Sequence, residues 1–113
     1  MNYSIKMDVN ISENTRDYLN NLIDILYDKE YFGFRDSAKD YVEKIFAFIE
    51  TSIHTRPKKQ TPLSLRKYGS HYVTYRPNKT TTWYIFIFYS KDRYFINHIT
   101  NNHSTARYIK GLK

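Results

Sequence analysis

The stretch that decides the fold is Trp83-Tyr84-Ile85-Phe86-Ile87-Phe88-Tyr89. Every side chain in it is large and apolar or aromatic, and β-branched and aromatic residues favour the extended conformation. In a strand with one solvated face, apolar residues alternate with polar ones. This run shows no such alternation, so both faces of the strand require cover. The run therefore predicts a central strand whose side chains lie in the core.

Short strands on both sides of this run predict an antiparallel meander. Residues 71–76 form the first strand, and a Pro77-Asn78 turn closes it. The central strand is expected over 81–89 and the last strand over 93–100. Connections this short join strands that lie next to each other in an antiparallel sheet.

The N-terminal part predicts one strand followed by a helix. Residues 2–9 alternate between apolar and polar side chains, which is typical of a half-buried strand. Ser12 then offers an N-cap for a helix that extends to about residue 30. The apolar residues of this helix recur at helical spacing and are Tyr18, Leu19, Leu22, Ile23 and Leu26.

A second amphipathic helix follows Gly33, which breaks the first helical pattern. It is expected to begin at Asp36 or Ser37, where Ser37-x-x-Asp40 approximates a capping box, and to end before Pro57. Two neighbouring amphipathic helices with a short connection predict an αα-hairpin. The hairpin can cover only one face of the central strand.

The other face of the central strand needs cover from elsewhere. Residues 56–69 form a polar, basic segment, in which Leu63 and Leu65 are expected to act as a short hydrophobic anchor. We expect the cover to come from a C-terminal segment or from a binding partner. Residues 104–112 predict a last short helix, capped by Ser104.

The composition limits the classes of protein to which this chain can belong. With 113 residues, 41% of them hydrophobic and 18% aromatic, the chain is long enough for one domain with its own core, which we expect over 1–113. The absence of cysteine excludes disulfides, thiolate zinc sites and cysteine nucleophiles. No segment is apolar over the length of a membrane span, and residues 1–6 contain no apolar signal region. We therefore expect a cytoplasmic protein without membrane contact.

The charge divides sharply along the chain. Residues 1–50 have 6 Lys or Arg and 10 Asp or Glu, so their net charge is −4. Residues 51–113 have 12 Lys or Arg and one acid, Asp92, so their net charge is +11. A field of this size attracts phosphates or an acidic protein and speeds the encounter with either. The alternative is a solvated basic surface without a specific partner.

This layout resembles the RelE/ParE superfamily of toxins from type II toxin–antitoxin systems. The shared features are the order β-α-α-β-β-β with a terminal helix, the hairpin ahead of a basic loop, and the meander. Similarity at the level of residues is confined to about 63–109 and rests on Leu65-Arg66, on Tyr84-Ile85-Phe86 and on the run 99–103. The resemblance implies an α+β fold in which the antiparallel meander packs against the N-terminal hairpin.

The resemblance also implies a chemistry. Toxins similar to RelE cut messenger RNA on the ribosome and use the 2′-hydroxyl of the RNA as the nucleophile. Such cleavage needs a base, an acid and cations around the phosphate. It needs no metal and no cofactor, which suits a basic half with a single carboxylate, whereas a two-metal nuclease needs clustered acids.

Candidate residues follow from the resemblance and from residue chemistry. Candidates for catalysis are His103, Arg76, Arg66 and Arg107, because imidazole titrates near neutral pH and guanidinium groups bind phosphate. Candidates for RNA contact are Lys67, Tyr75, Asn101, Asn102, Lys58 and Lys59. For each of them, a solvated surface or turn residue is the alternative. His98 and His71 lie within predicted strands, so they are expected to be partly buried residues without a functional role.

Three functions remain open. The first is an endoribonuclease toxin that acts on RNA at the ribosome and is neutralised by a cognate antitoxin. The second is a toxin similar to ParE that inhibits DNA gyrase by binding alone. The third is a non-enzymatic binding module or an inactive relative of these toxins.

Overall fold

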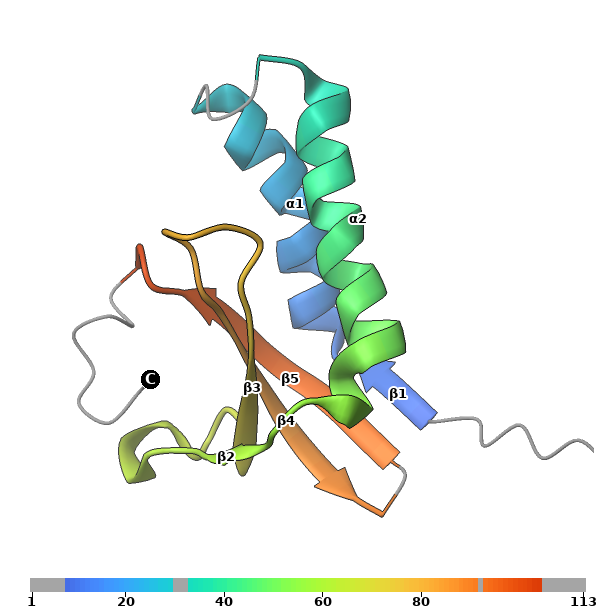
Figure 1. Ribbon diagram of the computed structural model, residues 1–113, viewed down its shortest axis with the longest axis vertical. Coiled ribbons are helices and arrows are strands. Elements are labelled where there is room, and N and C mark those ends of the chain that lie inside the picture. Colours follow the sequence, from blue (N-terminus) through green and yellow to red (C-terminus); the bar gives the residue numbers. More distant parts are fainter. Residues whose placement is uncertain (1–7, 30–32, 92, 105–113) are drawn as a thin grey trace, which may run out of the picture.

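A five-stranded mixed sheet forms the centre of the structure, a computed structural model that describes residues 8–29, 33–91 and 93–104. The elements in chain order are β1 (Asp8–Ile11), α1 (Glu13–Asp28), α2 (Arg35–Ser52), the 3-10 turn η1 (Ile53–Thr55), β2 (Lys59–Gln60), the 3-10 turn η2 (Leu63–Leu65), β3 (His71–Tyr75), β4 (Trp83–Ser90) and β5 (Arg93–Asn101). The strand order is β1-β5-β4-β3-β2, and the two helices lie side by side next to the sheet (Figure 1). The α+β class is therefore confirmed.

The predicted meander is confirmed, and one further strand is added at each of its edges, β1 beside β5 and β2 beside β3. Strands β3, β4 and β5 are antiparallel neighbours, as the short turns predict. β1 joins the edge of β5 in parallel, with Asp8 opposite Arg93. Residues 2–7 of the predicted first strand lie outside the described residues, and so does the predicted last helix beyond Ser104. The described part of the chain contains no helix that is both long and apolar enough to cross a membrane.

The helix starts differ in how well the sequence predicts them. Ser12 caps α1 as expected, because its hydroxyl oxygen accepts the Thr15 backbone N–H at 3.2 Å. The predicted start of α2 at Asp36 or Ser37 is wrong, because Phe34 is the N-cap and no side chain caps this end. The Ser37 backbone N–H already donates to the Phe34 carbonyl, so Ser37 lies inside the helix rather than at its cap.

One core lies between the helices and the sheet. The fully buried residues include Leu19 of α1, Ile45 and Ile49 of α2, Ile85 of β4 and Ile96 of β5. Trp83 completes this layer, and its indole N–H donates to the Tyr41 hydroxyl at 2.9 Å. The indole therefore gains burial without losing its hydrogen bond.

A second cluster covers the opposite face of β4. Leu65 and Tyr68, from the segment before β3, pack with Tyr72, Tyr84 and Phe86. The prediction that only a C-terminal segment or a partner could cover this face is therefore wrong, because the basic segment itself supplies cover. Of its two predicted anchors, Leu65 is buried, whereas Leu63 is 78% exposed and anchors nothing.

The expectation that all of 83–89 lies in the core holds only as far as Ile87. Trp83, Tyr84, Ile85, Phe86 and Ile87 are buried. The last two aromatic residues of the run, Phe88 and Tyr89, are 40% and 39% exposed. The covering segment (residues 61–70) reaches β4 at Ile87, where the Ser70 hydroxyl donates to the Ile87 carbonyl at 3.5 Å.

Gly69 allows the covering segment to touch β4. A Cβ atom at Gly69 would lie 2.6 Å from the backbone nitrogen of Ile87 and 2.7 Å from its carbonyl oxygen. Neither atom can move without disturbing the pairing of β4, so only glycine fits this approach.

We therefore expect Gly69→Ala to lower the free energy of unfolding by about 1–3 kcal/mol, the usual cost of overpacking. Urea denaturation followed by circular dichroism measures the loss. The matched control is Gly33→Ala, because a Cβ atom at Gly33 meets nothing within 4 Å and the change there should be about 0.5 kcal/mol or less. Equal stability of the two variants would contradict this packing.

Candidate functional site

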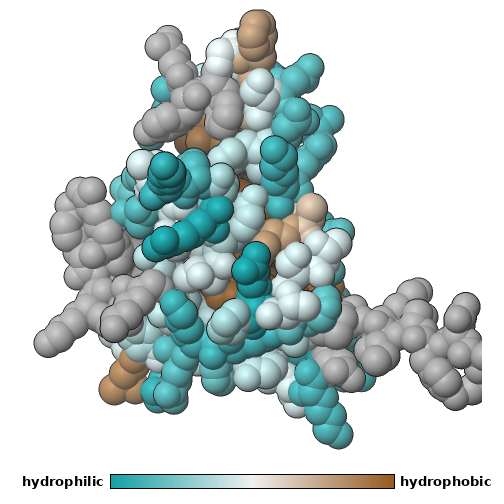
Figure 2. Space-filling view, in the orientation of Figure 1, coloured by the Kyte–Doolittle hydropathy of each residue, from teal (hydrophilic) through white to brown (hydrophobic). Residues whose placement is uncertain are grey.

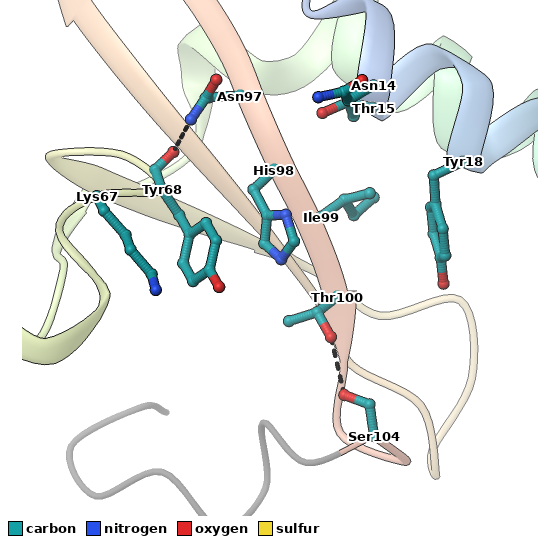
Figure 3. A pocket seen from close by; sticks show the side chains of 10 residues that line it. All are labelled: Asn14, Thr15, Tyr18, Lys67, Tyr68, Asn97, His98, Ile99, Thr100 and Ser104. Atoms are coloured by element: carbon teal, nitrogen blue, oxygen red, sulfur yellow. Dashed lines mark hydrogen bonds between the residues drawn. The ribbon is translucent and has the colours of Figure 1, made fainter.

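A cavity of about 650 Å³ opens between α1, β5 and the segment before β3. Its described lining residues are Asn14, Thr15, Tyr18, Lys67, Tyr68, Asn97, His98, Ile99, Thr100 and Ser104. In Figure 3, Lys67 and Tyr68 extend from one segment on one side of β5, and Tyr18 extends from α1 on the other side. The cavity thus brings together three parts of the chain that are distant in sequence.

The end of β1 creates this opening. β1 pairs with β5 only as far as Ile11, which lies opposite Ile96. The Ser12 backbone N–H then donates to the Ile96 carbonyl at 2.8 Å, and the chain turns into α1. Beyond this point, no described strand pairs with the outer edge of β5, which allows the cavity to form beside it.

A β-bulge in β5 determines which side chains enter the cavity. Phe86 of β4 pairs with His98, but the next residue, Ile87, pairs with Ile96, so Asn97 is an extra residue in β5. The Asn97 side-chain amide donates to the Tyr68 carbonyl at 2.9 Å and ties the covering segment to the strand. The bulge shifts the alternation, so His98 lies on the face opposite the helices.

His98 stacks on Tyr68 at the centre of the cavity wall. The ring centroids are 4.1 Å apart with an interplanar angle of 17°, and Phe86 lies on the same side at 5.8 Å from His98. Burial lowers the pKa of His98 below its ordinary value of 6.5. The imidazole is therefore neutral at physiological pH, and a neutral imidazole can accept a proton.

Lys67 places a positive charge beside this stack. Its Nζ atom lies 5.1 Å from the centroid of the Tyr68 ring, within the range of a cation–π interaction. No carboxylate is found among the described lining residues, so nothing in this lining neutralises the ammonium group. The site combines the neutral imidazole of His98, the stacked rings of His98 and Tyr68, and the Lys67 ammonium group. Together these groups suit a phosphate that is attached to a planar nucleobase.

The predicted residues His103, Asn102 and Arg76 gather at a different place, around Thr81 and Thr82 before β4. The His103 Nε2 atom lies 3.0 Å from the Thr81 hydroxyl. The Asn102 Oδ1 atom accepts the Thr82 backbone N–H at 2.9 Å, and Arg76 Nε donates to the Thr82 hydroxyl at 3.1 Å. Each of these contacts joins a residue just after β3 or β5 to the turn before β4.

Asn101 and His103 also form part of a second cavity of about 430 Å³ on the side of the helices. Its other described lining residues are Leu22, Leu26, Tyr41, Asn78, Thr80, Thr81 and Trp83. The Asn101 side chain accepts the His103 backbone N–H at 2.8 Å, which is ordinary turn chemistry. His103 and His98 therefore belong to different cavities.

The remaining predicted residues are spread over the molecule. Arg66 is exposed, and its Nε donates to the Thr61 carbonyl at 3.2 Å. Tyr75 packs its ring against Phe48, with centroids 4.7 Å apart, on the helix side of the sheet. Lys58 Nζ donates to the His54 carbonyl at 2.8 Å, and burial lowers its pKa.

The last two predicted cations are Lys59 and Arg107. Lys59 is exposed in the two-residue strand β2 at the edge of the sheet. Arg107 lies outside the described residues. Of the predicted catalytic and RNA-contact residues that the structure describes, only Lys67 lines the cavity that contains His98.

The sequence did contain a signal for His98. In the last strand the buried residues Tyr94, Ile96 and Ile99 are two and then three residues apart, and a break in the two-residue period indicates a bulge. A bulge after Ile96 turns His98 away from the helices and beside the covering segment. Its partner Tyr68 could not be found in this way, because the fold of 61–70 depends on contacts with β4.

Comparisons with protein-family models, with curated proteins and with solved structures found no match for this chain. Within residues 8–29, 33–91 and 93–104, no group of three His, Asp or Glu side chains is placed to hold a metal ion.

The lowered pKa of His98 predicts how stability depends on pH. The unfolded chain binds a proton at about pH 6.5, and folded His98 binds it only at a lower pH. As the pH falls below about 6.5, the unfolded state therefore binds more protons and the free energy of unfolding decreases. We expect His98→Gln to reduce this decrease, measured by urea denaturation between about pH 7.5 and 5.

The matched control is His54→Gln, because His54 is exposed on η1 and outside both cavities. It should leave the pH dependence as it is in the parent chain. A His98→Gln variant with an unchanged pH dependence would contradict the buried, neutral imidazole.

Proposed function

We propose that this chain is an endoribonuclease that cleaves RNA by attack of its own 2′-hydroxyl, as toxins similar to RelE do, and that an antitoxin neutralises it in the cytoplasm. The observation that supports the proposal best is the stacking of His98 on Tyr68 beside Lys67, in a place where burial lowers the pKa of His98. The charge of +11 on residues 51–113 adds long-range attraction for an RNA or a ribosome.

In the proposed reaction, His98 acts as the base, and Lys67 stabilises charge and acts as the acid. His98 accepts the proton of the 2′-hydroxyl, and the resulting oxygen attacks the adjacent phosphorus. A 2′,3′-cyclic phosphate forms as the bond to the 5′-oxygen breaks. Lys67 stabilises the additional negative charge on the phosphate oxygens and supplies the proton that the leaving 5′-oxygen takes up.

Tyr68 positions the reacting groups in this proposal. Its ring fixes the plane of the imidazole by stacking, and the exposed parts of both rings can stack with a splayed base. His103 and Arg76 are assigned here to the turn at Thr81 and Thr82, which they hold by hydrogen bonds. Catalysis through His98 and Lys67 therefore replaces the set that the resemblance implies.

The test is controlled expression in a bacterium, with growth followed alongside primer extension on an abundant messenger RNA. We expect growth arrest and discrete new 5′ ends. His98→Ala should reduce cleavage by about 10²–10⁴-fold, the usual contribution of a general base. Lys67→Ala should reduce it by about 10²-fold through the lost charge.

Matched controls separate chemistry from folding and from bulk charge. His54→Ala and Lys44→Ala remove the same residue types from exposed positions on η1 and α2, and both should remain toxic. Full toxicity of His98→Ala and Lys67→Ala would overturn the proposed site. Arrest with intact messenger RNA would indicate inhibition of gyrase instead, and no arrest would indicate a binding module.

A further inference from the structure

Two phenylalanines lie uncovered on the sheet face that also bears His98. Phe88 of β4 and Phe95 of β5 are direct cross-strand partners, and each is 40% exposed. Their neighbours in the same strands, Ile87 and Ile96, are fully buried against the helices. The two rings therefore form a small aromatic surface on a rigid part of the sheet.

The bulge places this surface on the same side as the cavity. Before Asn97, the side chains of β5 that face away from the helices are Arg93 and Phe95, and after it they are His98 and Thr100. In β4, Phe88 follows Phe86, the partner of His98, by two residues, which is about 7 Å along a strand. One extended nucleotide spans a comparable length, so a chain that leaves the cavity along the strands reaches this surface.

Polar and cationic groups border the two rings. Asn10 of β1 is the cross-strand partner of Phe95 and is exposed, so Asn10, Phe95 and Phe88 form one row across three strands. Lys91 and Arg93 at the adjacent hairpin end are exposed. Arg93 lies 3.9 Å from the Asp8 carboxylate, but both side chains are more than half exposed, and such pairs contribute little in water.

Aromatic faces, an amide and exposed cations on an open sheet are the elements that bind single-stranded nucleic acid. Stacking on a phenyl ring suits any base, and cations beside it suit the phosphates. An apolar protein partner would require a larger uncharged surface than two rings bordered by lysine and arginine. Charge and shape therefore favour RNA as the occupant.

We propose that Phe88 and Phe95 form a base-stacking platform that binds the single-stranded RNA next to the bond cleaved at His98. The inference rests on the proposed function, and it adds a substrate-binding subsite outside the cavity. The platform adds affinity for RNA and fixes the position of the RNA strand relative to His98. It takes no part in the proton transfers.

The experiment measures binding of a fluorescein-labelled 2′-O-methyl RNA decamer to the full chain by fluorescence anisotropy. This probe lacks the 2′-hydroxyl nucleophile and stays intact. We expect Phe88→Ala/Phe95→Ala to raise Kd by about 10-fold or more, because stacking is worth about 1–3 kcal/mol per base. The salt dependence should stay unchanged, since phenyl rings carry no charge, whereas Lys91→Ala should reduce its slope.

Two further variants distinguish stacking from a loss of structure. Phe88→Tyr/Phe95→Tyr keeps both aromatic faces and should keep the parent affinity. Phe34→Ala removes a phenylalanine that is 76% exposed at the start of α2, and it should bind as the parent chain does. Parent-like affinity of the double alanine variant, or equal weakening by Phe34→Ala, would overturn the platform.

The platform and the proposed function can fail separately. Cleavage that depends on His98, together with unchanged probe binding by the double alanine variant, overturns the platform and leaves the enzyme intact. Probe binding that depends on both rings in a chain that leaves RNA uncut supports the platform and removes the enzyme. Capture of an acidic peptide through the two rings, without any binding of the probe, overturns the assignment to RNA.

Discussion

The rest of the structure depends on the burial of β4 between two apolar layers. One layer is the helical hairpin, whose residues Ile45 and Ile49 pack towards Ile85. The other is the short segment before β3, which places Leu65 and Tyr68 over Phe86. Burying apolar surface on both faces of one strand is the largest favourable contribution that so small a chain has available.

The contacts that fix the segment before β3 on β4 also form the candidate site. Gly69 brings the covering segment into contact with the backbone of β4, and the bulge at Asn97 gives that segment a hydrogen-bond donor. Tyr68 is thereby fixed over His98, and the stack loses part of its contact with water. The same contacts that cover β4 thus also lower the pKa of the imidazole in the cavity wall. In Figure 2 the surface seen in this view is mainly hydrophilic, with hydrophobic colour in scattered spots.

Local periodicity predicted most of the elements. The helical spacing around Leu19 and Leu22, the Ser12 cap and the all-apolar run of β4 each determine their element without help from distant residues. The start of α2 was misplaced because a capping motif in the sequence competes with the extended Phe34 that begins the helix. The fold of 61–70 was missed because its 3-10 turn and its close approach at Gly69 follow from contacts with β4. The residues of the candidate cavity could be predicted only in part. Lys67 could be named from charge alone, whereas the role that we propose for His98 depends on Tyr68 and on a bulge, both of which act through tertiary contacts.

The parallel pairing of β1 with β5 also determines the order in which the molecule can form. Ser12 and Asn97, which are in contact, are 85 residues apart in the chain. β1 can therefore pair only after β5 has been synthesised. On a ribosome the helical hairpin leaves the exit tunnel long before the strands that cover its apolar face. Formation of the sheet then requires contacts between distant parts of the chain, and such contacts form more slowly than the local contacts of a helical bundle of this size. The apolar faces of the helices therefore stay exposed until β4 and β5 have formed, and transient exposure of this kind favours aggregation.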